Sequence, residues 1–347
     1  MKQNDKPQKP QANKLPEGYF EIFSQAFRRI WRNPQIWFWG LLIPSGFAYQ
    51  FGGGDSPEGS AGDYSPEDML AAAGNFISEN LVWIIMGILI ILAVSLFLWV
   101  LSSIARAGLI KKIDKMQNVS GEKGQFKEIW ELGRLRFVNI LKIDLIVFAI
   151  TLLLGGGIAL MIFGVFQNPN PGLISISVVF GVAVFIGLLL LLAAKSIAVI
   201  FTVFVDLNSI DSIKKGFGAI FANKLEFIKL LFLILLINII TGIALAIAVF
   251  MILLIVGAPL ALLAKIANFS NIAIMMVAAG ISGLFMILLA LFLKAFTALW
   301  KLDVWIWWVK KVSAEKTKED SKESSLDPVL ETMASKKPEV AMEKRGD

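Results

Sequence analysis

Two lysines, Lys195 and Lys294, are the residues whose surroundings most suggest chemistry, because each stands inside a long apolar run. A charged side chain at the centre of a bilayer costs about 3 kcal/mol on insertion scales, so such residues usually face protein or water. One hypothesis is a shared polar site that binds an anionic headgroup or substrate. The alternative is that both long side chains reach the nearby membrane surface.

The acidic residues near the apolar runs are weaker candidates for a functional site than the two lysines. Asp144, Asp206 and Asp303 lie near the ends of these runs, and Lys142 and Lys301 close by would supply local ion pairs. A proton relay is the alternative. The chain has no His and no Cys, so it lacks the commonest general base, the commonest transition-metal ligand and any thiol nucleophile. We expect no catalytic, metal-binding or cofactor-binding residues, and no enzyme.

The composition is that of a membrane protein. The 347 residues are 56% hydrophobic, with a mean hydropathy of +0.71, and the apolar residues form long blocks. A helix of about 20 apolar residues crosses the hydrocarbon core. The net charge of +6 does not indicate a nucleic-acid partner, because the basic residues lie between and beyond the blocks.

The blocks predict an all-α integral membrane protein with six transmembrane helices. Their approximate ranges are 34–52, 81–105, 141–166, 173–204, 225–257 and 272–300. The first is the weakest, because it is short and contains Pro44 and Gly46. Residues 1–16 and 312–347 are polar without an apolar period, which predicts disordered cytoplasmic tails on either side of a membrane domain at 17–311.

The distribution of Lys and Arg predicts the orientation. Segments 1–33, 106–140, 206–224 and 309–347 carry 7, 8, 3 and 9 of these residues, and the alternating segments 53–80, 167–172 and 258–271 carry 0, 0 and 1. Cytoplasmic loops are the ones enriched in Lys and Arg. We therefore expect a multi-pass protein of the plasma (inner) membrane with both termini in the cytoplasm.

A similar heptad precedes three of the spans. The copies are WRNPQIW, FVNILKI and FANKLEF, aligned at Asn33, Asn139 and Asn223. Each Asn would mark a structural joint, at which its side-chain oxygen accepts from the free N–H groups of the next helix, worth about 1 kcal/mol.

Apolar residues at matching distances before the first and third Asn predict amphipathic helices. The two stripes are Phe20, Phe23, Phe27, Ile30 and Trp31, and Ile210, Ile213, Phe217, Ile220 and Phe221. A helix with such a stripe and a basic polar face lies in the membrane interface. The second copy departs from the pattern at Gly133 and Arg136.

The spans that follow the outer loops also align, which places Ser102 with Lys195 and Lys294. The chain thus predicts three hairpin repeats, each preceded by an amphipathic interfacial helix. A chance match between hydrophobic sequences is the alternative.

Small residues spaced by four within the spans predict close helix packing. The pairs are Gly155 and Ala159, Ser177 and Gly181, Gly242 and Ala246, and Ala279 and Gly283. A broken helix that lines a transport site is the alternative. At the end of the last span, Trp300, Trp305, Trp307 and Trp308 predict an aromatic belt at the membrane surface.

The lead-in RRIWRNPQIWFW, the recurring aromatic-x-Asn joint and the six spans together resemble a bacterial and archaeal group of membrane proteins. These are similar to the glycerophosphoryl diester phosphodiesterase membrane domain, and the resemblance covers roughly residues 17–311. Some members carry a soluble barrel that hydrolyses glycerophosphodiesters. This chain has no stretch long enough for that barrel and no counterpart of its catalytic histidines, so the resemblance implies the membrane fold without the activity.

The leading hypothesis is a non-enzymatic structural, lipid-associated or assembly role. Its partners would be membrane lipids, together with other membrane proteins or a second copy of the chain. The alternative is a transporter of a small solute or lipid that uses Lys195 and Lys294, and an intramembrane enzyme is a third hypothesis.

Because the chain has no Cys, single-cysteine labelling tests the predicted topology without background. A membrane-impermeant thiol reagent added outside intact cells should label Ser60→Cys. The same reagent should label Ser120→Cys and Asp320→Cys only after lysis. Labelling of either of the last two in intact cells would contradict the orientation.

Overall fold

The computed structural model describes residues 16, 18–43, 66–118, 126–167, 170–259 and 272–335, and these form helices and short connections without a strand. The elements are α1 (Tyr19–Trp31), the 3-10 turn η1 (Pro34–Ile36), α2 (Trp37–Leu41), α3 (Pro66–Asn118), α4 (Phe126–Arg134), α5 (Phe137–Gln167), α6 (Pro171–Val205), α7 (Ser209–Ala222), α8 (Lys224–Ile252), the π-helical turn η3 (Leu253–Gly257) and α10 (Ile272–Ser335).

Five helical segments are long and apolar enough to cross a membrane. They are Phe76–Asn118, Phe137–Gln167, Pro171–Val205, Lys224–Gly257 and Gly280–Glu315. They contain the predicted second to fifth spans and most of the sixth, so an all-α membrane protein is confirmed. The structure describes only the beginning of the predicted first span, where α2 ends at Leu41. Residues 44–52 of this span lie outside the described residues.

The C-terminal part of the chain differs from the expected tail. Helix α10 continues to Ser335, whereas the sequence predicts disorder from residue 312. Residues 312–335 include four Glu and three Lys, which are good helix formers, and this part of α10 continues a helix that has already formed. Residues 336–347 and the predicted tail at 1–15 lie outside the described residues.

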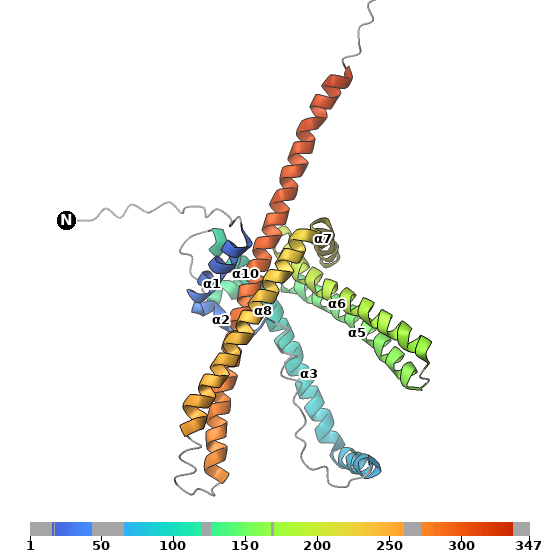
Figure 1. Cartoon of the computed structure of the whole chain (residues 1–347), viewed down its shortest axis with the longest axis vertical. Coiled ribbons are helices and arrows are strands. Elements are labelled where there is room, and N and C mark those ends of the chain that lie inside the picture. Colours follow the sequence, from blue (N-terminus) through green and yellow to red (C-terminus); the bar gives the residue numbers. More distant parts are fainter. Residues whose placement is uncertain are drawn as a thin grey trace, which may run out of the picture.

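The long helices meet in one region, and three groups of them diverge from it on one side (Figure 1). We call this region the junction; it consists of α1, α2, α4 and α7, the adjoining ends of α3, α5, α6 and α8, and the middle of α10. On one side of the junction lie three arms, namely α3, the α5–α6 pair and the pair of α8 with the first part of α10, while the last part of α10 continues on the opposite side. Most of the buried hydrophobic residues belong to the junction, whereas Leu92, Leu153 and Val179, like most apolar residues of the arms, are exposed.

Each short helix packs mainly against one long helix: α4 on α3, α7 on α6, and α1 and α2 on α10. Glycines permit the first two contacts. A Cβ atom on Gly108 of α3 would meet the carbonyl group of Ile129 in α4, and one on Gly133 would meet that of Ile104. A Cβ atom on Gly216 of α7 would lie 2.6 Å from the carbonyl oxygen of Ala194 in α6. The helix backbones therefore touch at these points.

The glycines that the sequence analysis selected for close packing do not have this role. Gly155, Gly181, Gly242 and Gly283 lie in the arms, and no other atom comes within 4 Å of the place where each would carry a Cβ atom. Within the described chain the prediction of close packing at these glycines was wrong, because the spacing of small residues is the same in an arm and at a contact.

Helices α1 and α7 bury equivalent faces. Ile22, Ala26 and Ile30 of α1 and Ser212, Gly216 and Ile220 of α7 are buried, at the same distances before Asn33 and Asn223. Of the predicted apolar stripes, Ile30 and Ile220 belong to this buried face, whereas the aromatic members lie beside it and are more exposed, with Phe20 79% accessible. Within each stripe two rings stack at equivalent positions: Phe27 on Trp31 and Phe217 on Phe221. The two helices thus share a packing pattern, whereas α4 buries Ile129 and Gly133, one residue out of this register.

The contact between α3 and α4 gives a stability prediction. Gly108→Ala places a methyl group against the backbone of α4, and overpacking of this kind costs about 1–3 kcal/mol. We expect a lower midpoint of thermal unfolding in detergent, followed by tryptophan fluorescence. The control Gly87→Ala lies in the same helix with nothing within 4 Å, so its midpoint should stay or rise. Equal midpoints for the two variants would contradict the close contact.

Candidate functional site

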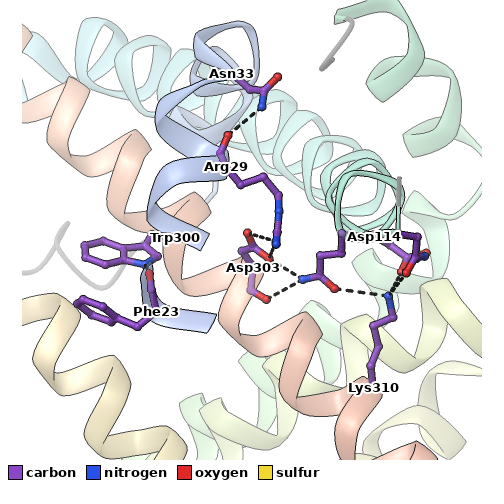
Figure 2. Close-up of polar contacts among 9 residues, drawn as sticks. Phe23, Arg29, Asn33, Asp114, Trp300, Asp303 and Lys310 are labelled. Atoms are coloured by element: carbon purple, nitrogen blue, oxygen red, sulfur yellow. Dashed lines mark hydrogen bonds and ion pairs between the residues drawn. The ribbon is translucent and has the colours of Figure 1, made fainter. Parts of the chain in front are cut away.

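A buried carboxylate at Asp303 joins three helices of the junction (Figure 2). Its side chain is fully buried in α10. Nη1 of Arg29, from α1, lies 2.6 and 2.7 Å from its two oxygens. Nε2 of Gln117, from α3, donates to Oδ1 at 2.5 Å. Charge-assisted hydrogen bonds of this kind fix the positions of both partners.

The same contacts continue to a second ion pair. Nζ of Lys310, two turns further along α10, lies 2.5 Å from Oδ1 of Asp114 and 3.0 Å from Oδ1 of Asn118, both in α3. We call Arg29, Asp114, Gln117, Asn118, Asp303 and Lys310 the Asp303 cluster. Its two cations and two carboxylates balance, and it ties α1 and α3 to α10.

A second buried carboxylate, Asp144 in α5, has two cationic partners. Arg106 of α3 pairs with both of its oxygens, and Nζ of Lys195 in α6 lies 2.9 Å from Oδ1. Trp99 Nε1 donates to Oδ2 at 3.3 Å. The Asp144 side chain is 3% exposed and that of Arg106 10%, but that of Lys195 is 24% exposed. We call these four residues the Asp144 cluster, and its formal charge is +1.

The two lysines selected from the sequence have different surroundings. Lys195 belongs to the Asp144 cluster. Lys294 in α10 is half-buried and has no ion-pair partner among the residues that the structure describes. Within that part of the chain no hydrogen bond or ion pair connects the two lysines, directly or through a shared side chain. The contacts therefore give no support for a common site.

The acidic residues pair with distant cations rather than with their sequence neighbours. Asp303 pairs with Arg29, 274 residues away, instead of Lys301. Asp144 pairs with Arg106 and Lys195 instead of Lys142. Sequence reasoning did not identify Arg29 and Arg106, because basic residues at span ends are expected from the orientation rule alone.

Asp206 ends α6 in the left-handed conformation, with φ 59°. It pairs with Arg136, near the start of α5. The Asp206 side chain is still 60% accessible, so it stays hydrated while it pairs with a cation from another segment.

Two of the three asparagine joints, Asn33 and Asn223, cap the preceding helix. Asn33 Nδ2 donates to the carbonyl of Arg29 at 2.8 Å, and Asn223 Nδ2 to that of Ala219 at 3.2 Å. Asn33 makes no side-chain cap to η1, so the prediction that it caps the following helix was wrong. Asn139 lies in the first turn of α5, where its carbonyl accepts from Ser209 at 3.0 Å.

The tryptophans at the end of the last predicted span form part of the core instead of an aromatic belt. Trp300, Trp307 and Trp308 are at most 2% exposed. Trp307 packs edge-on against Tyr19, with centroids 5.1 Å apart, and Trp300 packs against Phe23 at 4.7 Å. The belt prediction was wrong for these three rings, because α1 packs against Trp300 and Trp307 and Phe227 of α8 packs against Trp308. Trp305 is half-buried.

Ion pairs at the rim of the junction combine buried and exposed side chains: Lys112 is 1% exposed, Glu128 24% and Lys115 49%. Lys112 and Lys115 of α3 both pair with Glu128 of α4. Partial burial opposes ionisation of Glu128, but hydrogen bonds from both lysines outweigh it and lower its pKa. Tyr19 donates to Glu226 Oε2 at 2.5 Å, and its burial together with this carboxylate raises the pKa of the phenol. Both interactions persist at neutral pH.

Comparison with protein-family models, with curated proteins and with solved structures finds no match. Among the described residues, no group of three or more His, Cys, Asp or Glu could hold a metal ion. The arguments for function therefore rest on the two buried clusters and on the packing of the junction.

Asp303→Asn should destabilise the protein strongly, because it leaves Arg29 in a buried position without its carboxylate. Removing one partner of a buried ion pair costs about 3–5 kcal/mol. The control Glu131→Gln breaks the exposed pair with Lys127, whose side chains are 62% and 88% accessible, and should cost less than about 1 kcal/mol. Unfolding in increasing SDS, followed by tryptophan fluorescence, measures both.

The double variant Arg29→Leu with Asp303→Leu removes both charges and should recover part of the loss. If Asp303→Asn were as mild as Glu131→Gln, the Asp303 cluster would not hold the junction together.

Proposed function

We propose that the chain is a non-enzymatic plasma-membrane protein with a structural, lipid-associated or assembly role. The observation that carries the proposal is the distribution of packing. Buried polar and apolar contacts gather at the junction, while the arms present apolar side chains outward. Such an arrangement fixes the helices relative to one another at the junction. The apolar faces of the arms stay available for lipids or for other membrane helices.

The proposal includes six spans in three hairpin repeats, with both termini in the cytoplasm. The clustering of Lys and Arg in alternating segments supports this topology, and the equal buried faces of α1 and α7 support the repeat. Kinship with the group similar to the glycerophosphoryl diester phosphodiesterase membrane domain is part of the same proposal. It rests on RRIWRNPQIWFW and the aromatic-x-Asn joints.

The contacts of Lys195 favour this role over transport. A transporter that uses Lys195 and Lys294 needs both side chains at one hydrated site near mid-depth. Lys195 instead pairs with Asp144 at 2.9 Å, about 15 Å along α6 from its end at Val205. The ion pair gives this lysine a packing role at the edge of the junction.

Accessibility to a charged thiol reagent distinguishes the two functions. In the cysteine-free chain, Lys195→Cys and Lys294→Cys should both resist a membrane-impermeant methanethiosulfonate reagent added outside intact cells, while Ser60→Cys reacts. Labelling of both lysine positions from outside, at rates near that of Ser60→Cys, would support a water-filled pathway and contradict the structural role.

A further inference from the structure

We propose that the Asp144 cluster binds the phosphate of an anionic phospholipid; the inference rests on the lipid-associated role proposed above. The first argument is charge. Arg106 and Lys195 bring two positive charges to one carboxylate, whereas the cations and carboxylates of the Asp303 cluster balance. The surplus charge is partly exposed at Lys195, whose side chain is 24% accessible, and one phosphodiester anion would neutralise the Asp144 cluster.

The second argument is the supply of hydrogen-bond donors. Asp144 already accepts four hydrogen bonds or ion-pair contacts, two at each oxygen. Nε of Arg106 and Oγ of Ser102 are buried without a hydrogen-bond partner among the described residues, and both residues are more than nine-tenths buried. They lie one turn apart on the same face of α3. Both atoms are enclosed by protein, so an acceptor oxygen reaches them only when neighbouring side chains move, and a phosphate group supplies such an oxygen.

The third argument is the position of the cluster in the fold. In α3, Ser102 is the buried residue nearest to the arm, among the side chains that the structure describes. In α5, the buried residue nearest to the arm is Val147. Beyond them the apolar side chains Leu98 of α3 and Phe148 of α5 are 48% and 60% exposed. The arms to which they belong diverge from this point (Figure 1).

A phospholipid matches both the charged Asp144 cluster and the apolar side chains beside it. Its phosphate would contact Arg106, Ser102 and the exposed part of Lys195, and its acyl chains would cover the apolar side chains of α3 and α5. Phosphatidylglycerol carries one negative charge, which balances the cluster. Phosphatidylcholine has no net charge, and inorganic phosphate has no chains to cover the arms.

The test is a native mass-spectrometry titration of the purified full chain with phosphatidylglycerol, phosphatidylcholine and inorganic phosphate. The wild type should retain phosphatidylglycerol about tenfold more strongly than phosphatidylcholine, and millimolar inorganic phosphate should not displace it. A lost charge-assisted hydrogen bond corresponds to about a tenfold change or more. Lys195→Gln should therefore abolish the preference, and Lys195→Arg should keep it.

The matched control is Lys294→Gln, which removes a lysine from the corresponding place in the sequence alignment but outside the cluster, and should keep the preference. Ser102→Ala removes a donor that has no protein partner, so it should weaken retention of phosphatidylglycerol severalfold without lowering the unfolding midpoint. A preference that survives Lys195→Gln, or displacement by inorganic phosphate, would overturn the lipid site. Neither result would affect the thiol-labelling test, so the structural role is judged separately.

Discussion

A helix inside a bilayer gains little by burying one apolar face against another, because the surrounding lipid chains are equally apolar. This constraint explains why the contacts of the chain are so unevenly distributed. The arms are rich in Leu, Ile, Val and Phe, and most of these side chains are exposed. Close packing begins where the long helices acquire charged, amide and hydroxyl side chains and where short helices cover them. The geometry of the arms is therefore set at the junction.

The contacts at the junction join segments that are far apart in the sequence. Helix α1 lies on α10, near the other end of the described chain, and is held there by Arg29 and Asp303 and by the rings of Phe23 and Trp300. Helices α4 and α7 pack on α3 and α6 through close glycine contacts. The short amphipathic helices thus act as packing elements that connect the arms. The Asp144 cluster marks the edge of this packed region, and its extra positive charge distinguishes it from the balanced Asp303 cluster.

Much of this fold could be predicted from the sequence, because five of the helices are defined by hydropathy and length and the short helices by their apolar period. The partners of charged residues could not. Asp144 has Lys142 two residues away, yet its partners lie on α3 and α6, and a pairing across 38 or 274 residues leaves no local pattern. The glycines show the same limit: Gly108 and Gly133 lie outside the predicted spans, but they make the close contacts that were expected of Gly155 and Gly242 in the arms.

The central claim is that polar contacts with α10, rather than the membrane surface, hold α1 in place. Hydrogen–deuterium exchange of the full chain in lipid nanodiscs, comparing wild type with Asp303→Asn, tests it directly. The claim predicts that the amides of α1 exchange at least about tenfold faster in the variant, since the change removes more than about 1.4 kcal/mol of local stability, while those of α7 are unchanged. Identical exchange of α1 in the two proteins would contradict it.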